Sequence, residues 1–160
     1  MKQKMILMIL TRIAGLIYIM LHASILVHGE KIEKKQIKWV SIDEAEKLNK
    51  KKPKPTIVDV YTDWCGWCKK MDQSTFKDSA VVNYINTHYY AVKLNAESVK
   101  EITLKGEKVT ENQVAGELFK VTGYPTIVLI SKDFSSFTPV PGYQTADAFS
   151  DIIKKFREGK

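Results

Sequence analysis

The sequence contains few of the residues that build metal sites and disulfide-stapled folds. Its 160 residues include two cysteines and three histidines. Two cysteines are too few for a scaffold stapled by several disulfides. A structural zinc site needs about four ligands, and apart from the cysteines only His22, His28 and His88 are typical candidates. Because two of these histidines lie in the first 29 residues, which have the features of an export signal, a zinc site is not favoured.

Acidic residues are missing from the start of the chain. No Asp or Glu precedes Glu30, whereas Lys2, Lys4 and Arg12 supply three of the net +7 charges. The remaining sequence is therefore only mildly basic, and its densest basic stretch, residues 50–55, contains no aromatic side chain. Basic residues without interleaved aromatics indicate a solvated linker rather than a nucleic-acid surface. We expect no nucleic-acid partner.

The first 29 residues combine early lysines, apolar runs and small residues near their end. This pattern predicts a signal peptide over residues 1–29 and an exported, periplasmic domain over residues 30–160. A retained, outward-facing membrane anchor over residues 5–27 is the alternative, because this stretch nearly reaches the ~20 apolar residues of a spanning helix. Lipidation at a processed N-terminal cysteine is excluded, since no cysteine precedes Cys65. Both readings place the domain outside the cytoplasm.

Three segments rich in β-branched residues predict the strands of a central sheet. They cover residues 56–61, 89–94 and 126–130. The first lacks clean alternation of apolar and polar residues, as expected of a strand buried on both faces, and Asp59 is the anomaly within it. A short strand at residues 39–40 and a last strand near Phe137 complete the predicted set.

Helical segments with one apolar face separate these strands. They begin near positions 41, 69, 79, 110 and 145. Ser41 with Glu44 has the spacing of a capping box, and Thr110 with Gln113 can cap a helix that extends to Val121. The order of elements predicts an α/β fold, with a central mixed β-sheet covered by helices on both faces.

A polar insertion, residues 96–112, separates the second central strand from the helix that precedes Pro125. Its centre, Lys105-Gly106, predicts a small hairpin over residues 102–109, because glycine supplies the positive φ that a tight hairpin turn needs.

Cys65 and Cys68 form a C-x-x-C pair directly after the first central strand. A thiolate that attacks a disulfide forms a mixed disulfide, which a second nearby thiol must resolve. At the start of a helix, Cys65 lies where unpaired N–H groups stabilise a thiolate, and Cys68 lies one turn inside. We therefore expect Cys65 to attack and Cys68 to resolve. A soft-metal carrier and a purely structural bond are the alternatives.

Three sequence segments resemble successive landmarks of the thioredoxin superfamily. They are DVYTDWCGWCK at residues 59–69, VKLN at 92–95 and VTGYPT at 121–126. The resemblance covers about residues 56–156 and is most similar to exported, single-domain bacterial thioredoxin-like proteins of the thiol:disulfide interchange group. It implies a thioredoxin fold and a thiol:disulfide oxidoreductase that needs no metal or organic cofactor.

The resemblance also implies roles for side chains away from the cysteines. Asp59 matches the family's buried aspartate, which assists proton transfer to and from the resolving thiol, and Lys93 matches the lysine beside it. Burial is expected to raise the pKa of Asp59 toward that of a useful base. Pro125 matches the proline whose preceding peptide bond is cis, which leaves the backbone of Tyr124 free to pair with an extended substrate.

The expected substrate-binding residues lie beside the cysteines and Pro125. Trp64 matches the family's flanking tryptophan, and Gly66 and Trp67 lie between the two cysteines. With Tyr124 and Pro125 they complete the set. Trp67 stands where the best-known active site of the family has proline, so the direction of catalysis does not carry over.

We expect the protein to exchange disulfides with protein thiols, with reductase-like activity favoured. An exported reductase needs electrons from the membrane, so a separate membrane protein is the expected electron donor. A non-catalytic thioredoxin-fold binding module and a thiolate metal carrier are the alternative functions. Both account less well for the presence of Asp59 and Pro125 together with the cysteines.

Overall fold

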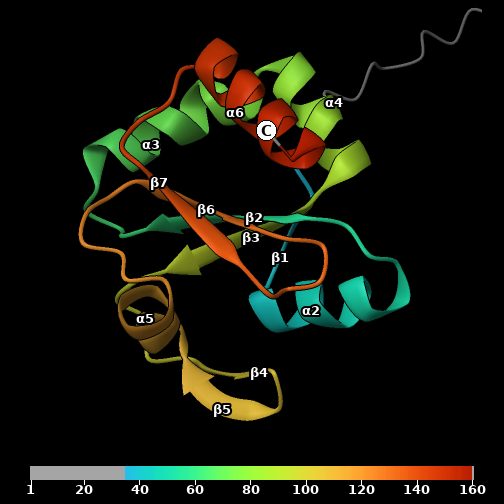
Figure 1. Ribbon diagram of the computed structural model, residues 1–160. Helices are drawn as coiled ribbons and strands as arrows, with labels where there is room; N and C mark the ends of the chain where they lie inside the picture. Colours follow the sequence, from blue (N-terminus) through green and yellow to red (C-terminus); the bar gives the residue numbers. More distant parts are fainter. Residues whose placement is uncertain (1–34, 160) are drawn as a thin grey trace, which may run out of the picture. The chain divides into compact units, whose positions relative to one another are not determined.

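A mixed five-stranded sheet is the centre of the computed structural model, which describes residues 35–159 (Figure 1). The strand order is β1-β3-β2-β6-β7. Three strands are parallel to one another: β1 (Trp39–Val40), β3 (Tyr90–Asn95) and β2 (Thr56–Tyr61). Two more continue the sheet in antiparallel orientation: β6 (Thr126–Ile130) and β7 (Phe137–Pro141).

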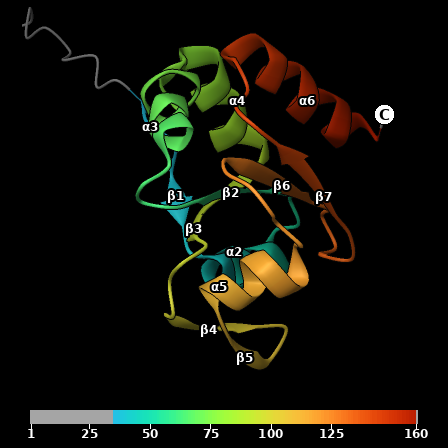
Figure 2. The ribbon, with the colours of Figure 1, turned by 90° about the vertical axis from the view of Figure 1, so that its left-hand side faces the viewer.

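Helices cover both faces of this sheet (Figures 1 and 2). One face carries α3 (Gly66–Gln73), the short η1 (Thr75–Lys77), α4 (Ser79–His88) and α6 (Ala146–Glu158). The other face carries α2 (Ile42–Lys51) and α5 (Glu111–Gln113). The predicted mixed sheet with helices on both faces is confirmed.

The side chains of β2 explain why this strand lacks a polar face. Ile57 packs into the apolar cluster shared with α3, α4 and α6, whereas Val58 and Val60 pack into the cluster on the opposite face. Asp59 shares a face with Ile57, because side chains two residues apart on a strand point the same way. The only charged residue of β2 therefore lies beneath the face that carries α3.

The predicted signal peptide or anchor at residues 1–29 lies outside the described residues. Within residues 35–159, no helix is long and apolar enough to cross a membrane.

The predicted capping box at the start of α2 is wrong. Ser41 does precede the helix, but no side-chain hydrogen bond caps it. The Ser41 hydroxyl instead donates to Oδ1 of Asp43 at 2.5 Å. A charged carboxylate two residues away is a stronger partner for this hydroxyl than the backbone groups that the box would use.

The predicted hairpin in the insertion is confirmed. β4 (Glu101–Leu104) and β5 (Glu107–Thr110) form a separate antiparallel pair. The turn has positive φ at both central residues, 53° at Lys105 and 87° at Gly106, as a two-residue hairpin turn requires. Ile102 and Leu104 join the apolar cluster on the α2 side of the sheet, so the hairpin is anchored to the domain.

The helix after the hairpin differs from its prediction. The expected cap is present, since the N–H of Thr110 donates to Oε1 of Gln113 at 2.9 Å. After α5 the chain widens into a π-helical turn, η2 (Val114–Leu118), in which the N–H of Phe119 donates to the carbonyl of Val114 at 2.9 Å. The helix ends there rather than at Val121, because Lys120 adopts a left-handed conformation with φ 54°.

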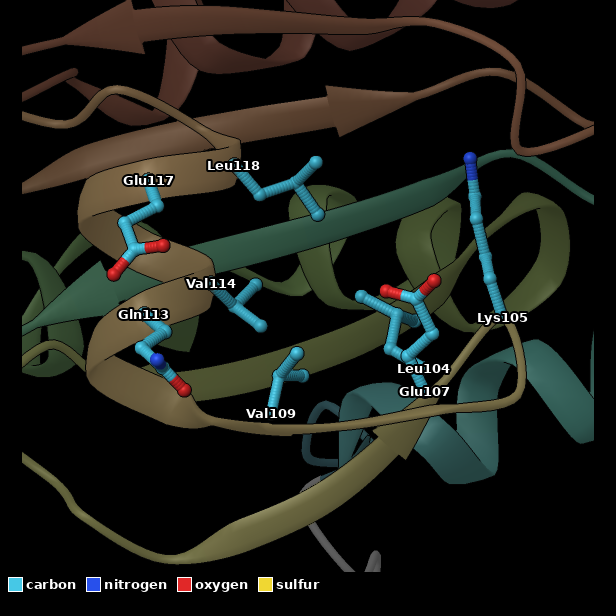
Figure 3. Close-up of a pocket in the computed structure, with 8 residues that line it drawn as sticks. All are labelled: Leu104, Lys105, Glu107, Val109, Gln113, Val114, Glu117 and Leu118. Carbon is cyan, nitrogen blue, oxygen red and sulfur yellow. The ribbon is translucent and has the colours of Figure 1, made fainter.

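A hollow of about 290 Å³ lies between the hairpin and η2 (Figure 3). Leu104 and Val109 from the hairpin and Val114 and Leu118 from η2 supply its apolar side chains. None of the expected site residues lines it.

Candidate functional site

The two cysteines form a disulfide bond at the start of α3. Their Cα atoms lie 5.3 Å apart. Cys65 is the N-cap residue of the helix, and its Sγ accepts a hydrogen bond from the backbone N–H of Cys68 at 3.1 Å. In the reduced protein this N–H group and the positive end of the helix would favour the thiolate form of Cys65. Within residues 35–159, no group of three or more His, Cys, Asp or Glu could hold a metal ion.

The disulfide lies just below the surface. Cys65 keeps only 4% of its surface exposed, whereas Trp64 and Trp67 on either side of it are 67% and 56% exposed. These are two of the three large apolar residues exposed in the described part of the chain. A partner protein approaching Cys65 therefore meets two indole rings, and an exposed apolar cluster of this kind is typical of an interaction site.

Pro125 lies at the same end of the sheet as the cysteines. β2 and β6 are antiparallel, with Val60 paired to Thr126. The end of β2, which leads to Cys65, therefore lies beside the start of β6, which follows Pro125. The Tyr124–Pro125 peptide bond is cis, as the resemblance implied.

Trp64 is held by contacts from two distant segments. Its ring meets that of Tyr124 edge-on, with ring centroids 6.0 Å apart and an interplanar angle of 80°. Its Nε1 donates to Oε1 of Glu97 at 2.9 Å. Glu97 belongs to the insertion, so this segment takes part in shaping the surface beside Cys65.

Trp67 is held on the other side of the disulfide. Its ring centroid lies 5.4 Å from that of Tyr143, and Nζ of Lys70 lies 4.7 Å from the Trp67 centroid and 5.3 Å from the Tyr143 centroid. Sequence reasoning missed both neighbours. The i, i+3 spacing of Trp67 and Lys70 on one helix was a usable signal, whereas nothing in the sequence linked Tyr143 to the site.

Asp59 and Lys93 form an ion pair beneath α3. They are directly paired in register on β2 and β3, and Nζ of Lys93 lies 2.6 Å from Oδ2 of Asp59. Asp59 is only 1% exposed, and its Oδ1 is buried without a hydrogen-bond partner. Burial raises the pKa of the Asp59 carboxyl, against the opposing effect of the Lys93 charge.

Lys93 binds a second carboxylate that sequence reasoning missed. Its Nζ donates to Oδ1 of Asp72 on α3 as well as to Asp59. The aromatic rings around the ammonium are those of Trp39, Tyr61 and Phe76, with centroids 5.1, 5.0 and 5.4 Å from Nζ. Burial acts to lower the pKa of Lys93, but the two carboxylates outweigh it and the pKa is raised. Asp72 lies four residues after Cys68, a helical spacing that would have pointed to it.

A mixed sheet with a disulfide at the start of the helix after β2, and a cis-proline before β6, defines a thioredoxin-like domain. The family model of the thioredoxin-like domain matches residues 42–157. The chain belongs to this family.

The comparisons with known proteins agree with this assignment. The thiol:disulfide interchange protein DsbD of Pectobacterium atrosepticum is 32% identical over 112 residues, which make up 66% of this chain and 17% of that protein. This chain therefore matches only a small part of the relative's length.

Two solved structures share the fold. A DsbH oxidoreductase has a TM-score of 0.62 at 23% identity, with 84% of this chain and 94% of that one covered. The C-terminal domain of Neisseria meningitidis DsbD in its oxidised form has a TM-score of 0.54 at 23% identity, with 70% and 89% covered.

Proposed function

We propose that this protein is a thiol:disulfide oxidoreductase that exchanges disulfides with protein thiols through Cys65. The observation that carries the proposal is the Cys65–Cys68 disulfide at the N-terminus of α3, on the face of the sheet that buries Asp59. A binding module would need neither a cysteine pair at a helix start nor a buried carboxyl beneath that helix, whereas disulfide exchange uses both.

The reaction proceeds in two exchanges. The Cys65 thiolate attacks one sulfur of a substrate disulfide, the substrate S–S bond breaks, and the other substrate sulfur leaves as a thiolate with the electron pair. Cys68 then loses its proton and attacks Sγ of Cys65 in the mixed disulfide, which releases the second substrate thiolate. The substrate gains two electrons, and its two thiolates take up two protons from solvent, which balance the protons lost by Cys65 and Cys68. The protein is left with the Cys65–Cys68 bond that the structure contains.

Asp59 is proposed to accept the proton of Cys68 in the second exchange. A general base acts best when its pKa lies near the working pH, and burial moves the pKa of Asp59 upward from the ordinary value of an exposed carboxyl. Lys93 limits this rise by favouring the charged carboxylate. Lys93 thereby favours the ionised form of Asp59, which is the form that can receive the proton.

The substrate is proposed to dock across Trp64, Gly66, Trp67, Tyr124 and Pro125. Trp64 and Trp67 supply exposed aromatic area on the two sides of Cys65, and such rings often dominate binding energy at protein interfaces. Tyr124 contacts Trp64 directly, which joins the segment before Pro125 to the same surface. The backbone of Tyr124 is the proposed partner for an extended substrate strand.

We propose that the protein works as a reductase in the periplasm. The support is the predicted export signal at residues 1–29 and the similarity to a thiol:disulfide interchange protein. After each turnover the Cys65–Cys68 bond must receive two electrons, and a membrane protein with its own dithiol is the proposed donor. Two sulfur atoms suffice to carry these electrons, so the proposal includes no metal or organic cofactor.

Insulin reduction by dithiothreitol tests the proposal. Wild type should accelerate the precipitation of insulin B chains, Cys65→Ser should be inactive, and Cys68→Ser should trap a mixed disulfide with the substrate. Full turnover by Cys65→Ser would contradict the proposal. Tight stoichiometric binding of copper or zinc by the reduced protein, together with loss of exchange activity, would favour the metal-carrier alternative instead.

A further inference from the structure

Asp72 is a carboxylate close to the redox pair that the mechanism above does not use. It lies on α3, one helical turn after Cys68, and its side chain is 45% exposed. Its Oδ1 accepts a hydrogen bond from Lys93, the residue that pairs with Asp59. One ammonium group therefore joins a surface carboxylate of the helix to a buried carboxylate of the sheet.

We propose that Asp72 is a positioning residue for disulfide exchange: it shares the Lys93 ammonium with Asp59 and so keeps Asp59 basic enough to take the proton of Cys68. This inference rests on the proposed function. It assigns Asp72 a role through Lys93 and no contact with the substrate.

The surroundings of Lys93 hold its ammonium between the two carboxylates. Three aromatic rings lie around Nζ at centroid distances of 5.0 to 5.4 Å, and rings at this distance attract a cation. An ammonium has three N–H donors, so it can serve Asp59 and Asp72 together. Because the side chain is confined in this way, loss of Asp72 would leave the charge of Lys93 directed at Asp59.

The titratable groups around Lys93 can be named individually. The titratable side chains that face Lys93 are Asp59 and Tyr61 on β2 and Asp72 on α3. Trp39 on β1 and Phe76 in η1 are neutral. Burial raises the pKa of Tyr61, with Asp63 and Glu111 acting in the same direction, so the neutral phenol is favoured over the charged form. Asp72 and Lys93 are therefore the charges that act on Asp59.

The sign of the effect follows from these contacts. The negative charge of Asp72 raises the pKa of Asp59, and the positive charge of Lys93 lowers it. Asp72→Asn removes the first effect and strengthens the second, so the Asp59 carboxyl should titrate at lower pH. A weaker base slows removal of the Cys68 proton, and the rate of the second exchange should fall by up to about fivefold, the size expected for loss of a partly exposed ion pair.

Two measurements test the proposal. The first is the titration of the Asp59 carboxyl carbon by NMR in the oxidised protein, and the second is the pH profile of mixed-disulfide resolution. Asp72→Asn should move the Asp59 midpoint and the acidic limb of the profile to lower pH, whereas Asp72→Glu, which keeps a carboxylate, should restore most of both. Asp63→Asn is the matched control, because it also removes one negative charge near the cysteines, whereas Asp63 does not contact Lys93.

An Asp59 midpoint that is unchanged or raised in Asp72→Asn would overturn the inference. A change in thermal stability alone, with both pH readouts unmoved, would assign Asp72 a structural role and overturn it as well. Failure of the proposed function would appear instead as full turnover by Cys65→Ser. The NMR titration of Asp59 requires no turnover, so separate measurements test the two proposals.

Discussion

Trp64 lies edge-on to Tyr124, with the two ring centroids 6.0 Å apart. The contact joins the turn that carries Cys65 to the residue before the cis-proline, although the two rings are far apart in the sequence. A substrate segment bound along Tyr124 would therefore touch the Trp64 ring beside the reactive sulfur.

Trp64→Ala should weaken the binding of protein substrates more than it slows the chemistry. Interface tryptophans often contribute about 2 kcal/mol or more, so KM for a protein disulfide should rise by at least about thirtyfold. Turnover of a small aromatic disulfide, which does not span this surface, should change little. Steady-state kinetics with both substrates measures the difference. Val99→Ala removes another exposed apolar side chain and serves as the control.

The stability of oxidised Asp59→Asn, relative to that of wild type, should increase as the pH rises. The folded-state pKa of Asp59 is raised above its ordinary value of 3.8, so the stability that its proton contributes is fully present below that value. This contribution is lost as the pH rises through the folded-state pKa, by at most about 1.4 kcal/mol per pH unit. Asparagine does not titrate and escapes the loss. Urea unfolding between pH 3 and 9 measures the free energy of unfolding of both proteins, and a difference that does not shift in favour of Asp59→Asn as the pH rises would contradict the prediction.

The same substitution should slow the second exchange. A positioned general base contributes about 10²-fold or more to a proton transfer, so resolution of the mixed disulfide near pH 7 should slow by about this factor in Asp59→Asn. Stopped-flow measurement of substrate release from the mixed disulfide reports this step. The first attack by Cys65 should be nearly unaffected, which separates loss of the base from general damage to the site.

Lys93→Gln should destabilise the folded protein most at high pH. Removing one partner of a buried ion pair costs about 3 kcal/mol because the other charge stays buried without compensation. Asp59 escapes part of this cost at low pH by taking up a proton, so the loss should be smaller at pH 5 than at pH 8. The double variant Asp59→Asn/Lys93→Gln should recover much of the loss. Equal losses in the single and double variants at pH 8 would show that the ion pair is not the cause.

Two glycines of the insertion and the helix after it should respond in opposite ways to alanine. Gly106 has φ 87°, so Gly106→Ala places a side chain in the left-handed region and should cost about 1 kcal/mol of stability. Gly116, in η2, has a negative φ, and a methyl group added there would meet no atom within 4 Å, so Gly116→Ala should be neutral or stabilising. Chemical denaturation of both variants checks the contrast, and equal losses would contradict it.

Strong local signals account for the elements that the sequence predicted well. The bounds of β2 and β6 match residues 56–61 and 126–130, because each strand is a dense β-branched run that starts directly after a proline. Lys105-Gly106 predicted the hairpin because a tight hairpin turn needs positive φ, which glycine adopts readily. By contrast, Ser41 matched a cap pattern but bonded to Asp43, since a local side-chain partner competes with the backbone.

Many contacts in the site join residues that no periodicity in the sequence relates to one another. Cys65, Cys68 and Pro125 stood out in the sequence as a motif, and Asp59 stood out as a charge within an apolar strand. Trp39 and Phe76 reach Lys93 from separate elements, and their part in the site follows from packing rather than from spacing. The π-helical turn after α5 likewise had no local signal, because residue propensities do not separate it from an ordinary α-helix.

The β4–β5 hairpin gives this domain a convenient point for engineering. Its side chains pack on the α2 side of the sheet, whereas the disulfide begins α3 on the other side. A fluorophore or an affinity epitope attached at Lys105 would sit on a stable turn while leaving the sulfur accessible to its partners. Immobilised through that position, the Cys68→Ser variant could serve as a reusable bait for capturing disulfide-bearing proteins.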